Sequence, residues 1–158
     1  MSMSITLQRS YDAPPETIWR LWTTADGIER WWSPDGFTTD VQELDLRPGG
    51  ALVHAMTATD PGMVAFMEAN GMPLTNVGRK RFTEVDEPCR LGYVTEVDFV
   101  PGVEPYAHGT VVELEPIGDD GTRVTMTMDP MHDDEWTARA TAGRENELEN
   151  LAALLAGD

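Results

Sequence analysis

A long amphipathic segment near the C-terminal end, residues 133–156, constrains the fold more than any other part of the sequence. It opens with Asp133, Asp134 and Glu135, which suit the N-terminus of a helix, and Gly157 after it is a typical helix stop. Apolar residues recur inside it at steps of three and four, as on one helix face. They are Trp136, Ala140, Leu148, Leu151 and Leu155. We therefore predict one long helix that packs its apolar stripe against the rest of the chain.

Arg144 interrupts this stripe, because it falls between Ala140 and Leu148. A guanidinium on a buried face has to be paired or solvated. We favour a structural role, in which Arg144 pairs with an acid such as Glu147 or reaches water along its aliphatic stem. In the alternative role it holds a ligand's carboxylate or phosphate with two hydrogen bonds. The preceding Gly143 costs a helix about 1 kcal/mol relative to Ala, which we interpret as a sign of close approach to another element.

Most of the sequence before this helix predicts β-strands. Apolar and polar residues alternate at residues 4–11, 37–46, 51–59, 77–85, 91–99, 106–114 and 122–128. Segments rich in Gly, Pro and Asp, such as residues 47–50 and 116–121, separate several of these strands. Short connections of this kind imply an antiparallel sheet with one covered face.

Three further segments between the strands have helical character. Two short helices are predicted after the first strand, the second capped by Thr24 and ended by Pro34. We expect only one of Trp31 and Trp32 in the core, and the other at a pocket rim or an interface. Residues 61–73 have apolar residues at helical spacing and predict a short helix or a lid-like loop.

Composition limits the classes of partner. A length of 158 residues fits one domain, residues 1–158, and a net charge of −17 argues against nucleic acid and against anionic membrane surfaces. We see no signal peptide and no apolar run long enough to insert into a membrane, so a cytoplasmic protein is the default expectation. The single cysteine excludes an internal disulfide. Because ligand spacing is absent, we expect no metal, and nothing in the sequence indicates a cofactor.

Short motifs distributed over almost the whole chain point to a known family. They are Tyr11-Asp12-Ala13-Pro14 before Ile18-Trp19, Ile28-Glu29-Arg30-Trp31-Trp32 before Pro34 and Gly36-Phe37, Asp45-Leu46-Arg47-Pro48-Gly49-Gly50, Phe82-Thr83-Glu84-Val85-Asp86 with Pro88, and Gly143 with Leu148 and Leu151. With the order of elements, they resemble the START and birch-pollen-allergen superfamily, SRPBCC, in the branch of the activator of heat-shock-protein-90 ATPase. The resemblance implies an α+β helix-grip fold, with a curved antiparallel sheet of six to seven strands around the long helix.

The sequence departs from the family pattern at two places. The residue after the helix glycine is usually aromatic in the family and is Arg144 here. Residues 61–73 form a longer and more apolar segment than the polar hairpin tip that the family has there. Both departures fall where the resemblance places a cavity between sheet and helix.

The covered strand faces and the helices supply candidate residues for binding a small molecule. We predict as ligand-binding residues Trp31, His54, Met56, Phe66, Tyr93, Tyr106, His108, Met126, Met128, Trp136 and Arg144. Large apolar groups with a few polar ones are typical of a small-molecule pocket, but the same residues could simply fill the core. His54 and His108 could act as an acid and base pair, or could be core histidines satisfied by hydrogen bonds.

Three classes of function remain open from the sequence. The first is a protein that binds a lipid or another small, largely apolar molecule, with or without an acidic group. The second is an enzyme similar to polyketide cyclases or hydrolases of the superfamily, with no catalytic residue assigned. The third is a chaperone-associated protein, as the family name suggests. A homodimer through an exposed tryptophan or residues 61–73 also stays open.

Overall fold

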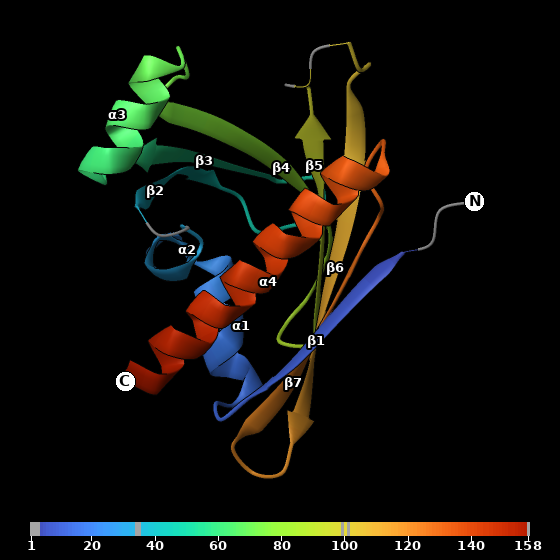
Figure 1. Cartoon of the computed structure of the whole chain (residues 1–158). Helices are drawn as coiled ribbons and strands as arrows, with labels where there is room; N and C mark the ends of the chain where they lie inside the picture. The colour runs from blue at the N-terminus through green and yellow to red at the C-terminus, as the bar shows by residue number, and fades with distance from the viewer. Residues whose placement is uncertain (1–3, 34–35, 99, 101, 158) are drawn as a thin grey trace.

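The computed structural model describes residues 4–33, 36–98, 100 and 102–157. Figure 1 shows the order of the elements along the chain. They are β1 (Ile5–Tyr11), α1 (Pro15–Thr23), α2 (Ala25–Trp31), β2 (Phe37–Leu44), β3 (Ala51–Ala58), α3 (Pro61–Ala69), β4 (Thr75–Asp86), β5 (Arg90–Val97), β6 (Tyr106–Ile117), β7 (Gly121–Met128) and α4 (Asp134–Gly157). Pro34, predicted to end the second short helix, and Phe99, predicted to extend the fifth strand, lie outside the described residues.

The strands form one curved antiparallel sheet that wraps around α4 (Figure 1). Within the described residues it has seven strands in the order β1-β7-β6-β5-β4-β3-β2. Each strand pairs with its sequence neighbour, except that β1 joins β7 and leaves β2 at the opposite edge. This arrangement confirms the predicted α+β helix-grip fold.

Two short helices connect the first two strands and fill the space under one end of α4. A proline at its first position starts α1, and Thr24 caps α2 by accepting a hydrogen bond from the Gly27 amide at 3.1 Å. Trp31 and Trp32 are both buried, so the expectation that only one would enter the core is wrong. The reason is that the two rings face different parts of the core: Trp31 packs edge-on against Trp22, whereas Trp32, the C-cap residue of α2, packs edge-on against His54 of β3.

Residues 61–69 form α3, which resolves the prediction of a short helix or a loop in favour of a helix. Asp60 caps it by accepting a hydrogen bond from the Met63 amide at 3.0 Å. The helix lies at the β3–β4 end of the sheet (Figure 1). Met67 is buried, whereas Phe66 is 59% exposed.

The main core lies under the second half of α4. Leu148 and Leu151 of the predicted stripe are fully buried there, against residues of α1, α2 and the sheet. The Tyr11 hydroxyl donates a hydrogen bond to the Leu148 carbonyl at 2.8 Å, and the Asn150 amide reaches the Ser33 carbonyl at 3.1 Å. These contacts fix the second half of the helix and leave its first half over a different part of the sheet.

Candidate functional site: a cavity between sheet and helix

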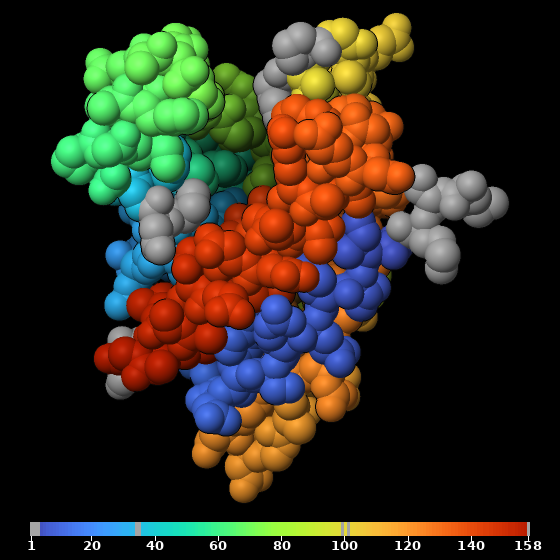
Figure 2. All heavy atoms as spheres, viewed as in Figure 1, coloured from blue at the N-terminus to red at the C-terminus, as the bar shows by residue number. Residues whose placement is uncertain are grey.

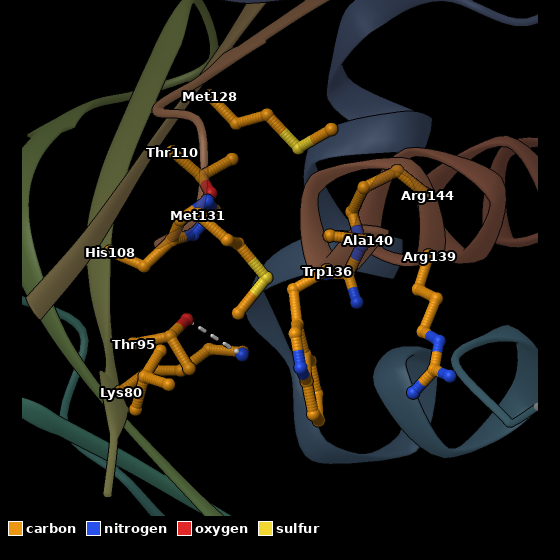
Figure 3. A pocket seen from close by; sticks show the side chains of 11 residues that line it. Lys80, Thr95, His108, Thr110, Met128, Met131, Trp136, Arg139, Ala140 and Arg144 are labelled. Carbon is orange, nitrogen blue, oxygen red and sulfur yellow. Dashed lines mark hydrogen bonds between the residues drawn. The ribbon is translucent and has the colours of Figure 1, made fainter. Parts of the chain in front are cut away.

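A cavity of about 270 Å³ lies between the first half of α4 and strands β4 to β7. In the space-filling view the surface is hollowed between the β4 side and the first turns of α4 (Figure 2). Figure 3 shows the side chains that surround the cavity. They are Lys80, Thr95, Val97, His108, Thr110, Met128, Met131, Trp136, Arg139, Ala140 and Arg144.

The strand register builds the floor of the cavity. Lys80 on β4 pairs with Thr95 on β5, which pairs with His108 on β6, so these three side chains lie side by side across the sheet. In the next row Thr110 on β6 pairs with Met128 on β7. The helix supplies the opposite wall. The floor is thus polar toward β4 and apolar toward β7.

The cavity brings together His108, Met128, Trp136 and Arg144 from the predicted ligand-binding set. Tyr93 does not line the cavity but lies next to Lys80, two residues before Thr95 on β5. The Tyr93 ring is buried with its centroid 5.6 Å from the Lys80 Nζ atom. Burial raises the pKa of Tyr93 to about 12; the charge of Arg144 partly opposes this effect, and the charge of Glu147 adds to it.

His54 is also a neighbour of the cavity rather than a lining residue. Its ring packs against Gly78 on the neighbouring strand, where an added Cβ would lie 2.7 Å from His54 Cε1. Neither ring nitrogen has a hydrogen-bond partner among the described residues. Burial lowers the pKa of His54 to about 4, with the charges of Lys80 and Arg144 acting in the same direction. The structure therefore does not place His54 and His108 together in one cavity.

The remaining predicted residues lie elsewhere. Trp31 is in the core, where its indole N–H donates to the Leu21 carbonyl at 2.8 Å, and Met126 is fully buried on β7. Met56 is half-buried on β3, outside the cavity. Phe66 points outward from α3. Tyr106, the first residue of β6, contacts His132, which comes just before α4.

Lys80 is the most unusual residue of the cavity, and it is the only lysine in the sequence. It is 8% exposed, and its amine donates a hydrogen bond to Thr95 Oγ1 at 3.0 Å. The ring centroids of Trp32 and Tyr93 each lie 5.6 Å from Nζ. Burial lowers the pKa of Lys80 to about 7, and Arg144 lowers it further while a carboxylate on α4, Glu147, acts in the opposite direction.

The alternation of residues on β4 contains a signal that places Lys80 on the covered face, which the prediction of candidate residues missed. The run Arg79-Lys80-Arg81 resembles an exposed charged strand. However, residues two apart in a strand share a face, and Lys80 is two residues before the buried Phe82. Arg79 and Arg81 are exposed on the other face. Strict alternation on β4 would have placed the single lysine on the covered side.

Arg144 has the ion pair with Glu147 that the structural role predicts, and its side chain also lines the cavity. Its Nε atom lies 3.2 Å from Glu147 Oε2, an ion pair within one turn of α4. The Nε–H is nevertheless not directed at that oxygen and has no hydrogen-bond partner among the described residues. Figure 3 shows the Arg144 side chain extending along Ala140 into the cavity. Burial raises the pKa of Glu147, whereas Arg144 and Lys80 lower it.

Gly143 does not have the role that we expected. A Cβ added at this position would meet no atom within 4 Å among the described residues. The helix therefore makes no close approach there, and the interpretation of Gly143 as a contact point is wrong. The glycine lies beside Arg144, at the edge of the cavity wall.

His108 is fixed by the segment that follows β7. Its Nε2 atom lies 2.6 Å from the Asp129 carbonyl oxygen, which can only accept, so Nε2 carries the proton. Burial lowers the pKa of His108, and the hydrogen bond and charge of Asp129 partly oppose this effect. His108 is therefore a neutral, oriented polar group at the cavity floor.

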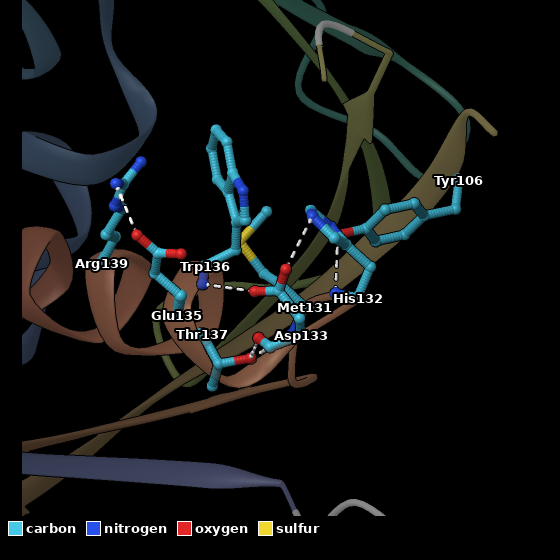
Figure 4. Close-up of polar contacts among 8 residues, drawn as sticks. All are labelled: Tyr106, Met131, His132, Asp133, Glu135, Trp136, Thr137 and Arg139. Atoms are coloured by element: carbon cyan, nitrogen blue, oxygen red, sulfur yellow. Dashed lines mark hydrogen bonds and ion pairs between the residues drawn. The ribbon is translucent and has the colours of Figure 1, made fainter. Parts of the chain in front are cut away.

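A cluster of polar contacts holds the first turn of α4 against β6 (Figure 4). The Tyr106 hydroxyl accepts from the His132 backbone amide at 3.2 Å and lies 2.8 Å from His132 Nδ1, to which it can donate. Asp133 caps the helix by accepting from the Trp136 amide at 2.7 Å. The Arg139 guanidinium stacks 5.3 Å from the Trp136 ring centroid. These contacts position Trp136 and Arg139 as the outer wall of the cavity.

The described part of the chain has neither a metal-binding cluster nor a membrane-spanning helix. No group of three or more His, Cys, Asp or Glu side chains there could hold a metal ion. None of the helices described there is long and apolar enough to span a membrane.

Comparison with known proteins identifies the family. The family model described as Activator of Hsp90 ATPase homolog 1-like protein matches residues 12–156. The chain belongs to this family. The match covers every described element after β1, apart from the last residue of α4, and it includes the whole cavity. The comparison with curated proteins gives no match.

Solved structures of bacterial proteins share the fold of this Activator of Hsp90 ATPase homolog 1-like chain. A protein from Chromobacterium violaceum is 26% identical with a TM-score of 0.76, and the alignment covers 98% of each chain. A protein from Mycobacterium smegmatis is 23% identical with a TM-score of 0.73, over 99% of this chain and 92% of its own. An AHSA1 protein from Silicibacter pomeroyi is 20% identical with a TM-score of 0.74, over 98% of both chains.

Proposed function

We propose that this protein binds a small, largely apolar molecule with one anionic group in the cavity between sheet and α4. The observation that carries the proposal is the pair of cationic side chains, Lys80 and Arg144, that extend into one cavity, whereas the third lining cation, Arg139, is exposed and paired with Glu135. Most of the other lining groups are apolar, including Val97, Met128 and Trp136. Small-molecule sites combine an apolar surface with a few placed polar groups in this way.

The balance of charge around the cavity favours an anion. Glu147 is the carboxylate that offsets both Lys80 and Arg144, so one cation is left without a full partner when both are charged. A buried cation without a partner is unfavourable, and this is why the pKa of Lys80 is lowered by burial. A ligand carboxylate would supply the missing charge and accept hydrogen bonds from both side chains.

The size of the cavity limits the ligand. A volume of about 270 Å³ lies near the lower end of the range for small-molecule sites. A single aromatic ring with a short acidic chain matches this size and polarity, whereas a long lipid would have to extend past Trp136 or Arg139 at the outer wall. We therefore infer a compact aryl or alkyl acid rather than a membrane lipid.

The proposal is tested with 3-phenylpropionate and its uncharged amide, 3-phenylpropionamide, by isothermal titration calorimetry. The wild-type protein is expected to bind the acid more tightly than the amide by about tenfold or more, because charged hydrogen bonds contribute about 1.5–3 kcal/mol. Lys80→Met and Arg144→Leu are each expected to remove most of this preference. Arg79→Met is the matched control, because it removes a positive charge from the exposed face of β4.

Two results would count against the proposal. Equal affinity for acid and amide in the wild-type protein would mean that the cations do not recognise an anion. A preference for the acid that Arg79→Met reduces as much as Lys80→Met does would mean that the overall surface charge, and not the cavity, attracts the ligand.

A further inference from the structure

The environment of Lys80 is suited to more than charge pairing. Its hydrogen bond to Thr95 orients the amine, and the rings of Trp32 and Tyr93 enclose the stem. Figure 3 shows Nζ directed into the cavity toward Trp136. The nitrogen is therefore held in place, shielded from bulk water and facing the space in which a ligand would lie.

The groups around Lys80 leave a large share of its amine unprotonated near neutral pH. Burial and the charge of Arg144 lower the pKa of Lys80 to about 7, although Glu147 opposes them. The histidines nearby add no positive charge at neutral pH, because burial lowers the pKa of both His54 and His108. Tyr93 stays neutral, since burial raises its pKa to about 12. A lysine amine that is desolvated and close to another cation is an activated nucleophile.

We propose that Lys80 forms a reversible imine with an apolar oxo acid whose carboxylate is held by Arg144. This inference rests on the proposed function, because the same cavity and the same arginine bind the acid. It assigns the ligand class more narrowly, as a compact aryl or alkyl acid with a carbonyl group beside the carboxylate. The reaction needs an amine, a carbonyl and an anchor for the acid, and the cavity contains the first and the last.

The step balances without any further reactant. The Nζ lone pair attacks the carbonyl carbon, the nitrogen–carbon bond forms, and one amine hydrogen passes to the carbonyl oxygen, which becomes a hydroxyl group. The nitrogen lone pair then forms the carbon–nitrogen double bond as the carbon–oxygen bond breaks, and the oxygen leaves as water with the second amine hydrogen. Glu147 is the carboxyl group whose charge acts on Lys80. Burial raises the pKa of Glu147, which suits proton transfer to the leaving hydroxyl group.

The single lysine makes the test direct. The protein is incubated with phenylpyruvate and sodium cyanoborohydride, which reduces an imine to a stable amine, and the adduct is located by peptide mass mapping. Lys80 and the chain's amino terminus are the amines that can react. We expect the adduct on Lys80, its loss in Lys80→Met, and protection when 3-phenylpropionate is present in excess.

A second comparison separates anchoring from reactivity. Phenylacetone has the same ring and ketone as phenylpyruvate but no carboxylate. Arg144→Leu is expected to reduce the yield of the phenylpyruvate adduct about tenfold more than the phenylacetone yield, which falls only because the pKa of Lys80 rises without the arginine charge. Arg79→Met should change neither yield.

An adduct confined to the amino terminus would overturn the imine inference. If 3-phenylpropionate still binds with the preference described above, the proposed function stands and only the covalent step fails. If that preference is absent as well, the proposed function has failed. A Lys80 adduct that forms equally well in Arg144→Leu would overturn the role given to the arginine.

Discussion

At the scale of single residues, the chemistry of the cavity depends most on one lysine. Lys80 is buried although an apolar residue would fit the covered face of β4 at less cost in solvation. Its neighbours lower its pKa instead of pairing it fully. A site that keeps a buried amine with a lowered pKa has the properties expected of a functional group rather than of a structural one.

Replacing Lys80 by methionine should stabilise the protein. The pKa of Lys80 is about 7 in the fold and near 10.5 in the unfolded chain, so between these values the unfolded state binds more protons. The free energy of unfolding of the wild-type protein therefore rises with pH across this window. The destabilisation caused by the buried charge of Lys80 is complete below about pH 7. We expect Lys80→Met to raise the free energy of unfolding by about 2–4 kcal/mol near pH 7, measured by urea denaturation, with the gain shrinking toward pH 10.

Arg79→Met is the control for this measurement. It removes a charge from the same strand but on the exposed face, so its effect should stay within about 0.5 kcal/mol at every pH. A Lys80→Met protein that is less stable than wild type near pH 7 would show that Lys80 is well paired in the fold.

At the scale of elements, α4 has two halves with different tasks. The second half packs Leu148 and Leu151 into the core, and the first half forms the cavity wall with Trp136, Ala140 and Arg144. Gly143 lies at the junction of the halves. Because no atom lies near its missing side chain, packing does not explain the glycine.

Gly143→Ala should therefore stabilise the helix. Alanine loses less backbone entropy than glycine in a helix interior, which predicts a gain of about 1 kcal/mol in the free energy of unfolding. Ala142→Gly, at the exposed neighbouring position, is the matched control and should cost a similar amount. A loss of stability in Gly143→Ala, measured by thermal or urea denaturation, would indicate that the helix needs this glycine for a contact.

At the scale of the whole molecule, the sequence was sufficient for the architecture. Alternating apolar residues and turn residues set the strands, and the 3.6-residue period set the long helix. The tryptophan pair was mispredicted because the core lies on two sides of α2, at Trp22 for Trp31 and at His54 for Trp32, and this depends on tertiary packing. Residues far apart in sequence meet in the cavity only through the strand register that pairs Lys80 with Thr95 and Thr95 with His108.

The register also explains which candidate residues reach the cavity. His54 was placed on the covered face correctly, but its strand lies one position beyond β4, under Trp32 rather than under α4. Phe66 was included because its segment is apolar, yet α3 stands at the end of the sheet and leaves it exposed. Both outcomes depend on strand order and on the place of α3, which the pattern of a single segment does not contain.

We infer that a partly uncompensated cation pair in this cavity receives an anionic ligand. The single lysine allows one measurement to test it, because protein labelled with carbon-13 at the lysine ε position gives one lysine signal. We predict that this signal titrates with a pKa of about 7 in the free protein and moves to a higher pKa when 3-phenylpropionate is added, but not with 3-phenylpropionamide. A lysine that titrates near its ordinary value of about 10.4 in every sample would contradict the account.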